Sequence, residues 1–211
     1  MQWLWAAVLT ALVAPAAWAE GTAGEFDYYV VALSWSPGWC DRTGYERGST
    51  QCDEDRKLGW MLHGLWPQYA AGWPSSCKTD AQAPSATQAL EMADIMGTEE
   101  LAAYEWRKHG TCSGLSASEY FALSREAFAS VVRPEWFRHQ KVDQTVTAAS
   151  IEKRFLQANP QFTADMLTVT CKAGQIQEVR VCMTKDLKPS ICSQDVRKDC
   201  DLADARLVSI P

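Results

Sequence analysis

The sequence predicts an α+β fold with a mostly antiparallel sheet. Strand-forming runs lie near the N-terminus and in a late hairpin, and most of the helical segments lie between them. These segments lack the regular βαβ rhythm of a doubly wound sheet. The 211-residue chain has no internal repeat or long linker, so a single domain of residues 20–211 is expected after a short leader.

The expected strands are runs of apolar, β-branched and aromatic residues. We expect Pro67 to end the second strand, because proline cannot donate a hydrogen bond to a ladder. The polar stretch between the first two strands is expected to be a long loop. The last two strands flank Lys172-Ala173-Gly174, which predicts a β-hairpin with Cys171 beside about residue 176. The strands are expected at residues 27–35, 57–66, 167–171 and 175–184.

The expected helices carry start and stop signals. Thr98 with two glutamates precedes the second helix, and Gly110 is expected to stop it. Ser116 and Glu119 match a capping box at the start of the third. The helices are expected at residues 85–96, 101–110, 116–132 and 148–158.

Residues 1–19 carry no charged side chain, are rich in Ala, Leu, Val and Trp, and end in Ala17-Trp18-Ala19. This small-x-small ending predicts a signal peptide cleaved after Ala19. The alternative is a membrane anchor, but the run before Pro15 is shorter than the ~20 apolar residues of a membrane span. We therefore expect a secreted or periplasmic monomer with no stable membrane association.

Cysteine content and net charge narrow the class of protein. All eight cysteines follow the predicted leader, and an even count in an exported protein predicts four disulfides. Zinc is the weaker alternative, because no Cys-x-x-Cys pair occurs. The net charge of −6 argues against a basic nucleic-acid-binding surface and predicts weak affinity for long polyanions. The cysteines are Cys40, Cys52, Cys77, Cys112, Cys171, Cys182, Cys192 and Cys200.

One candidate catalytic segment is EWRKHGTC, residues 105–112. On a helix, Glu105, Lys108 and His109 share one face, because residues three and four apart are neighbours. A base, a cation and a carboxylate together suit transfer of a phosphoryl group. The alternative is a solvated helix face with a Glu–Lys pair.

The second candidate segment is HGLWPQY, residues 63–69. His63 stands beside Gly64, which clears space, and Trp66, whose ring can stack on a nucleic-acid base. The alternative is a core histidine with a tryptophan that fills volume. His139, the remaining histidine, matches no motif and is expected at the surface.

Together the two segments resemble the active-site motifs of the ribonuclease T2 family. LSWSPGWC (33–40), KRFLQANP (153–160) and the region from Cys171 to Cys200 resemble further parts of that family. The resemblance implies cleavage of an RNA substrate through a 2′,3′-cyclic phosphate, without a metal or other cofactor. It implies His109 as general base and His63 as general acid, and a bell-shaped, acidic pH profile.

The resemblance also implies roles for further residues, and at some positions this sequence differs from the family pattern. It implies that Lys108 and Glu105 stabilise the phosphorane and that Trp66 stacks on a base. Tyr104 stands where many members have a third histidine. Gln68 stands where some have a base-selecting aspartate, and Ser34 where many have glutamine. Tyr69 and Trp73 are further candidates for substrate binding.

The family pattern implies two disulfides, Cys40–Cys52 and Cys77–Cys112. The second would join the loop after the His63 segment to the end of the His109 helix. A nested arrangement of Cys171–Cys200 around Cys182–Cys192 completes the expected set.

Three other functions fit parts of the sequence. An inactive family relative could bind a partner, although both histidines, Lys108 and Glu105 are present. A phosphoesterase with paired His-x-Thr motifs fits His109 but not His63. A metal-dependent nuclease fits poorly, because the three histidines are far apart in sequence and no Asp-x-Asp cluster lies near either motif.

Overall fold

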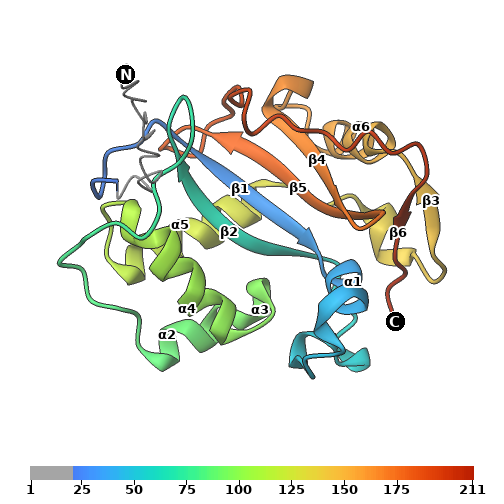
Figure 1. Cartoon of the computed structure of the whole chain (residues 1–211), viewed down its shortest axis with the longest axis horizontal. Helices are drawn as coiled ribbons and strands as arrows, with labels where there is room; N and C mark the ends of the chain where they lie inside the picture. Colours follow the sequence, from blue (N-terminus) through green and yellow to red (C-terminus); the bar gives the residue numbers. More distant parts are fainter. Residues whose placement is uncertain (1–20) are drawn as a thin grey trace, which may run out of the picture.

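The computed structural model describes residues 21–211, so the predicted signal peptide lies outside the described residues. This part of the chain forms one six-stranded sheet of order β2-β1-β5-β6-β3, with β4 paired to β5 (Figure 1). The described ladders are antiparallel except for one parallel pair between β5 and β6, which confirms the predicted α+β class. The strands are β1 (Tyr28–Trp35), β2 (Trp60–Gln68), β3 (Gln144–Val146), β4 (Leu167–Lys172), β5 (Gln175–Met183) and β6 (Ala205–Leu207).

Hydroxyl side chains cap four of the described helices. Ser85, Thr98, Ser116 and Thr147 each accept a hydrogen bond from a backbone N–H of the first turn, which satisfies a donor with no partner inside the helix. The expected helix 85–96 is divided at Met92 into α2 and α3. The helices are α1 (Ser36–Trp39), α2 (Ala86–Glu91), α3 (Ala93–Met96), α4 (Glu99–Lys108), α5 (Ala117–Ser130) and α6 (Ala148–Ala158).

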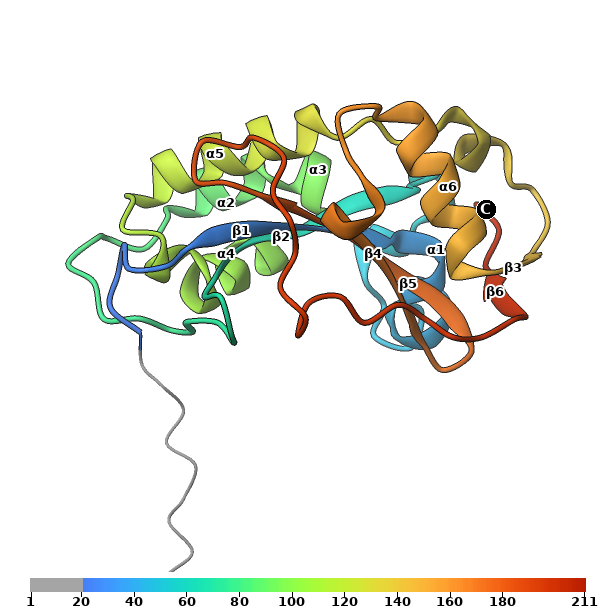
Figure 2. The ribbon, with the colours of Figure 1, turned by 90° about the horizontal axis from the view of Figure 1, so that it is seen from above.

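The two faces of the sheet have different surroundings. In Figure 2, α5 and α6 lie on one side of the sheet, where strand and helix side chains form the main core. A smaller cluster of Tyr28, Val30, Ala32, Cys182, Cys192 and Val196 covers part of the other face, and the half-buried Trp66 packs against it. The second face is therefore only partly filled by side chains.

Strand β2 continues past Pro67 to Gln68, so the expectation that this proline ends the strand is wrong. The strand lies at the end of the sheet order and pairs with β1. A proline is tolerated on an edge strand, because its missing N–H is not needed by a second neighbour. The edge position, which local sequence does not reveal, explains the difference.

Four disulfides join the described cysteines in the expected pairs. They are Cys40–Cys52, Cys77–Cys112, Cys171–Cys200 and Cys182–Cys192. Cys171 lies opposite Ile176 in the β4–β5 hairpin, as predicted. Among residues 21–211, no helix is both long enough and apolar enough to cross a bilayer.

Candidate active site

His63 occupies a β-bulge in β2. Ala32 of β1 pairs with Gly64 and the next residue, Leu33, pairs with Leu62, so His63 is the extra residue of its strand. A bulge redirects side chains and is common beside active sites. Leu62 is completely buried in the main core, whereas the side chain of His63 is 32% exposed.

Glu105 and His109 lie at the C-terminal end of α4. The backbone N–H of His109 donates to the carbonyl of Glu105 at 2.8 Å, so one turn of helix fixes their relative positions. Both side chains are buried. Cys112 lies three residues after His109 and is bonded to Cys77, which ties this helix end to the loop after β2.

The Glu105 carboxylate lies between the two imidazoles. Its Oε1 is 3.7 Å from Nε2 of His63, and its Oε2 is 4.0 Å from Nε2 of His109. Trp66 Nε1 donates to Oε2 at 2.7 Å, and the indole stacks on the His109 ring at 5.2 Å between centroids. Residues from β2 and α4, widely separated in sequence, thus form one cluster.

A cavity of about 360 Å³ opens at this cluster, within the range typical of small-ligand sites. It brings together eight of the nine predicted site residues, and Tyr69 is the exception because it packs against the main core. His139 is exposed and pairs with Glu135 at 3.1 Å. The eight are His63, Trp66, Gln68, Trp73, Tyr104, Glu105, Lys108 and His109.

The predicted substrate-binding residues differ in their exposure to solvent. Trp73 is 53% exposed and Tyr104 is 44% exposed, and both residues line the cavity. Lys108 Nζ lies 5.6 Å from the centroid of the Tyr104 ring. Gln68 is buried, and its amide N–H group donates to the backbone carbonyl of Pro67 at 2.9 Å.

Two charged residues of β5 belong to the site and carry no motif in the sequence. Glu178 Oε1 lies 2.6 Å from Nδ1 of His63. Arg180 donates to the other oxygen, Oε2, through Nε at 2.9 Å and Nη2 at 2.7 Å. The available signal is two charges at alternate positions of an apolar strand, which places both on one face.

His63 and Glu178 stabilise each other's charged forms. Burial alone would lower the pKa of His63, but the hydrogen bond to Glu178 and the charges of Glu178 and Glu105 outweigh it and raise the pKa. Burial would raise the pKa of Glu178, yet His63 and Arg180 lower it to about 2. An imidazolium facing a carboxylate is the favoured state of this pair.

The pKa of His109 moves in the opposite direction. Burial, followed by the positive charges of Lys108 and His63, lowers the pKa of His109 to about 3. Burial raises the pKa of Glu105 against the opposing effects of His63, Trp66 and Lys108. One neutral and one charged imidazole therefore face the same cavity at mildly acidic pH.

A second cavity of about 680 Å³ adjoins the first and shares His63, Tyr104, Gln177 and Glu178 with it. Its lining includes three basic side chains, Arg42, Arg47 and Lys172. The two cavities therefore meet at His63.

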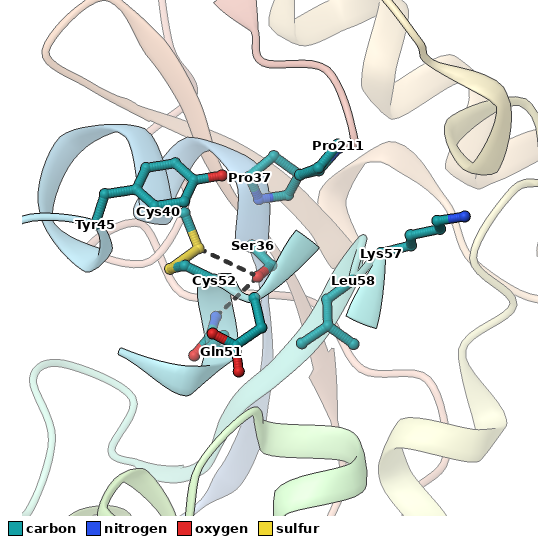
Figure 3. Close-up of a pocket in the computed structure, with 10 residues that line it drawn as sticks. Ser36, Pro37, Cys40, Tyr45, Gln51, Cys52, Lys57, Leu58 and Pro211 are labelled. Atoms are coloured by element: carbon teal, nitrogen blue, oxygen red, sulfur yellow. Dashed lines mark hydrogen bonds between the residues drawn. A yellow bond between two sulfur atoms is a disulfide. The ribbon is translucent and has the colours of Figure 1, made fainter. Parts of the chain in front are cut away.

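The pocket beside the Cys40–Cys52 disulfide is unsuitable for a substrate (Figure 3). Its volume is about 10 Å³, which admits at most one water molecule. Gln51 Nε2 donates to Ser36 Oγ within it at 2.9 Å. Within residues 21–211, no group of three His, Cys, Asp or Glu residues is placed to hold a metal ion.

Known proteins that are similar in sequence to this chain include ribonucleases of bacteria. A ribonuclease of Aeromonas hydrophila is 48% identical over 108 residues, which are 51% of this chain and 47% of that protein. A probable ribonuclease of Haemophilus influenzae is 39% identical over 120 residues, which are 51% of this chain and 44% of that protein. The matches therefore span about half the length of these bacterial relatives.

The fold is also similar to solved structures. An RNase-related protein from Calystegia sepium has a TM-score of 0.62 at 23% identity, over 89% of this chain and 98% of that one. The family model described as the ribonuclease T2 family matches residues 26–200. The chain belongs to the ribonuclease T2 family.

Proposed function

We propose that this protein is an endoribonuclease that cleaves single-stranded RNA with two histidines and no metal. The observation that carries the proposal is the pair of imidazoles beside one carboxylate, with the pKa of one raised and the pKa of the other lowered. General acid–base catalysis needs such a pair, one imidazole able to accept a proton and one able to donate it. The names of two bacterial relatives, a ribonuclease and a probable ribonuclease, support the assignment.

In the first step, Nε2 of His109 accepts the proton of the RNA 2′-hydroxyl, and the 2′-oxygen attacks the adjacent phosphorus. The bond from phosphorus to the 5′-oxygen breaks, and this oxygen takes a proton from Nε2 of His63. The products are a 2′,3′-cyclic phosphate and a free 5′-hydroxyl. DNA lacks the attacking hydroxyl and is therefore not a substrate.

In the second step the two imidazoles exchange roles. His63 takes a proton from water, which attacks the cyclic phosphate, and His109 returns a proton to the 2′-oxygen, leaving a 3′-phosphate. We propose that the Lys108 ammonium neutralises charge on the five-coordinate phosphorus, as fixed cations do in such transition states. Glu105, together with Lys108, remains the predicted stabiliser of the phosphorane, and its carboxylate lies 3.7 Å from His63 and 4.0 Å from His109.

We further propose that the cavity beside His109 holds a base, with Trp73 as its stacking surface. Trp73 is a half-exposed ring in the cavity, whereas Trp66 already packs against His109. Base stacking on Trp66 and contacts from Tyr104 and Gln68 remain predictions.

Replacement of Trp73 by alanine tests the stacking surface. Stacking on an aromatic side chain contributes ~1–3 kcal/mol per base, so Trp73→Ala is expected to raise KM for a short RNA with little change in kcat. Tyr45, also about half exposed but outside the cavity, supplies the control Tyr45→Ala. Equal KM values for Trp73→Ala and the wild type would place the base elsewhere.

We propose that the protein works outside the reducing cytosol. Four disulfides join all eight cysteines of the chain. Disulfides of this kind persist in secreted and periplasmic proteins.

Product analysis on a short single-stranded RNA tests the proposed reaction, with a DNA strand of the same sequence as control and a chelator present throughout. We expect RNA ends that carry a 2′,3′-cyclic phosphate and an intact DNA strand. RNA left intact across roughly pH 4 to 8, a range around the ordinary histidine pKa of about 6.5, would contradict the proposal.

A further inference from the structure

We infer that Glu178, held in place by Arg180, is a positioning residue that keeps the proton on Nδ1 of His63, so that Nε2 is the nitrogen that exchanges protons with the substrate. The inference rests on the proposed function and adds a residue to it. The two known motifs of the sequence contain neither Glu178 nor Arg180.

The geometry divides the Glu178 carboxylate between two partners. Oε1 faces Nδ1 of His63 at 2.6 Å, and Oε2 accepts two hydrogen bonds from Arg180. Glu178 is 1% exposed, and an ionised carboxylate so deeply buried is costly unless both oxygens have partners. Arg180 thus fixes the carboxylate and leaves one oxygen for the imidazole.

The carboxylate decides which imidazole nitrogen stays protonated. An ionised carboxylate only accepts hydrogen bonds, so Nδ1 of His63 must carry a hydrogen whether the ring is neutral or charged. The proton that leaves His63 therefore comes from Nε2. When His63 protonates the 5′-oxygen, the Nε2–H bond breaks, an O–H bond forms, and the Nδ1–H bond to Glu178 is retained.

The charges around His63 set its affinity for the exchanging proton. From β5 it faces Glu178 and Arg180, and from α4 it faces Glu105 and His109, with Lys108 next to the latter. Arg42 adds a positive charge near Glu178. The two carboxylates raise the pKa of His63 against burial and Arg180. Removing the charge of Glu178 should therefore lower the pKa of His63.

Histidine NMR titration with the variant Glu178→Gln tests the inference without RNA. The chain has three histidines, so their ring signals are easily assigned. In Glu178→Gln we expect the pKa of His63 to fall, and the alkaline limb of RNA cleavage to move to lower pH by the same amount. Each unit of fall lowers the protonated fraction about tenfold above the pKa, so kcat at pH 7 falls while KM changes little.

Two further variants provide the controls. Glu178→Asp keeps the charge and should retain most of the raised pKa of His63. Glu135→Gln removes the carboxylate of the exposed Glu135–His139 pair and should leave cleavage unchanged. If Glu178→Gln does not fold, ¹⁵N shifts of the wild-type protein still decide, because neutral His63 must be protonated on Nδ1.

An unchanged His63 titration in Glu178→Gln, or a wild-type His63 protonated on Nε2 when neutral, would overturn the inference. A shifted titration with an unmoved activity profile would also overturn it, because the charge of His63 would then not govern cleavage. A wild-type protein that leaves RNA intact would instead overturn the proposed function. The NMR result would still show whether Glu178 keeps the proton on Nδ1 of His63.

Discussion

His63 and His109 are the same side chain in two environments, and the environments shift their pKa values in opposite directions. A helix C-terminus favours a cation by up to ~2 kcal/mol, which would keep His109 protonated. Burial and the neighbouring Lys108 outweigh this effect and lower the pKa of His109 from 6.5 to about 3. His63 loses part of its hydration too, but two carboxylates compensate for it.

Gly64 is required by the packing around Glu105. A methyl group on Gly64 would collide with Glu105 Oε2 and Trp66 Nε1, whose hydrogen bond shapes the site. We expect Gly64→Ala to lower the free energy of unfolding by roughly 1–3 kcal/mol, the usual cost of overpacking, and to reduce RNA cleavage. Urea unfolding and cleavage rates measure the two effects.

The control for this substitution is Gly59→Ala, just before β2. There the added methyl would approach Trp35 at 3.3 Å, away from the catalytic cluster. We expect this variant to keep its cleavage rate. A Gly64→Ala protein as stable and active as the wild type would show that Glu105 does not need this space.

At the scale of elements, the sequence predicts the major strands and helices but not the bulge in β2 or the contact that β5 makes with it. The apolar runs and caps predicted the major strands and helices to within a few residues. The bulge at His63 depends on the register with β1, which local pattern does not contain. Glu178 comes into contact with His63 from 115 positions away, and only the sheet order makes them neighbours.

The Cys77–Cys112 disulfide joins the end of α4 to the loop after β2, and its loss should affect both stability and rate. The bond closes a loop with a sequence separation of 35, for which chain entropy gives about 4 kcal/mol. We expect the double variant Cys77→Ala/Cys112→Ala to lose stability of that order and to cleave RNA more slowly, because the end of α4 is no longer tied to β2.

The double variant Cys40→Ala/Cys52→Ala is the matched comparison. Its loop separation is 12, which gives about 3 kcal/mol, and its bond lies outside the catalytic cluster. Denaturation and kcat should be measured for both variants at a temperature where both are folded. Equal kcat values would show that the Cys77–Cys112 bond is only a general stabiliser.

At the scale of the whole molecule, the protein is acidic, so its attraction for a polyanion is confined to a local cluster of basic side chains. The net charge is −6, yet basic side chains gather in the two adjoining cavities: Arg42, Arg47, Lys108, Lys172 and Arg180. Such a distribution suits binding of a short stretch of RNA at the cleft and disfavours adsorption of long duplexes elsewhere.

The pH dependence of cleavage follows from the two shifted histidines. His109 accepts a proton only when neutral, so the rate should rise as pH increases through about 3. His63 donates only when charged, so the rate should fall as pH increases through a pKa above 6.5. We expect kcat/KM on a short RNA to form a broad plateau at mildly acidic pH. A rate that continues to rise above neutral pH would contradict this assignment.

The most direct measurement of the central claim is RNA cleavage by His63→Ala, His109→Ala and His139→Ala, each shown to be folded. The first two substitutions remove the proposed acid and base, and the third removes an exposed histidine outside the cleft. We expect the first two proteins to lose cleavage and the third to match the wild type. Wild-type activity in either His63→Ala or His109→Ala would contradict catalysis by this pair.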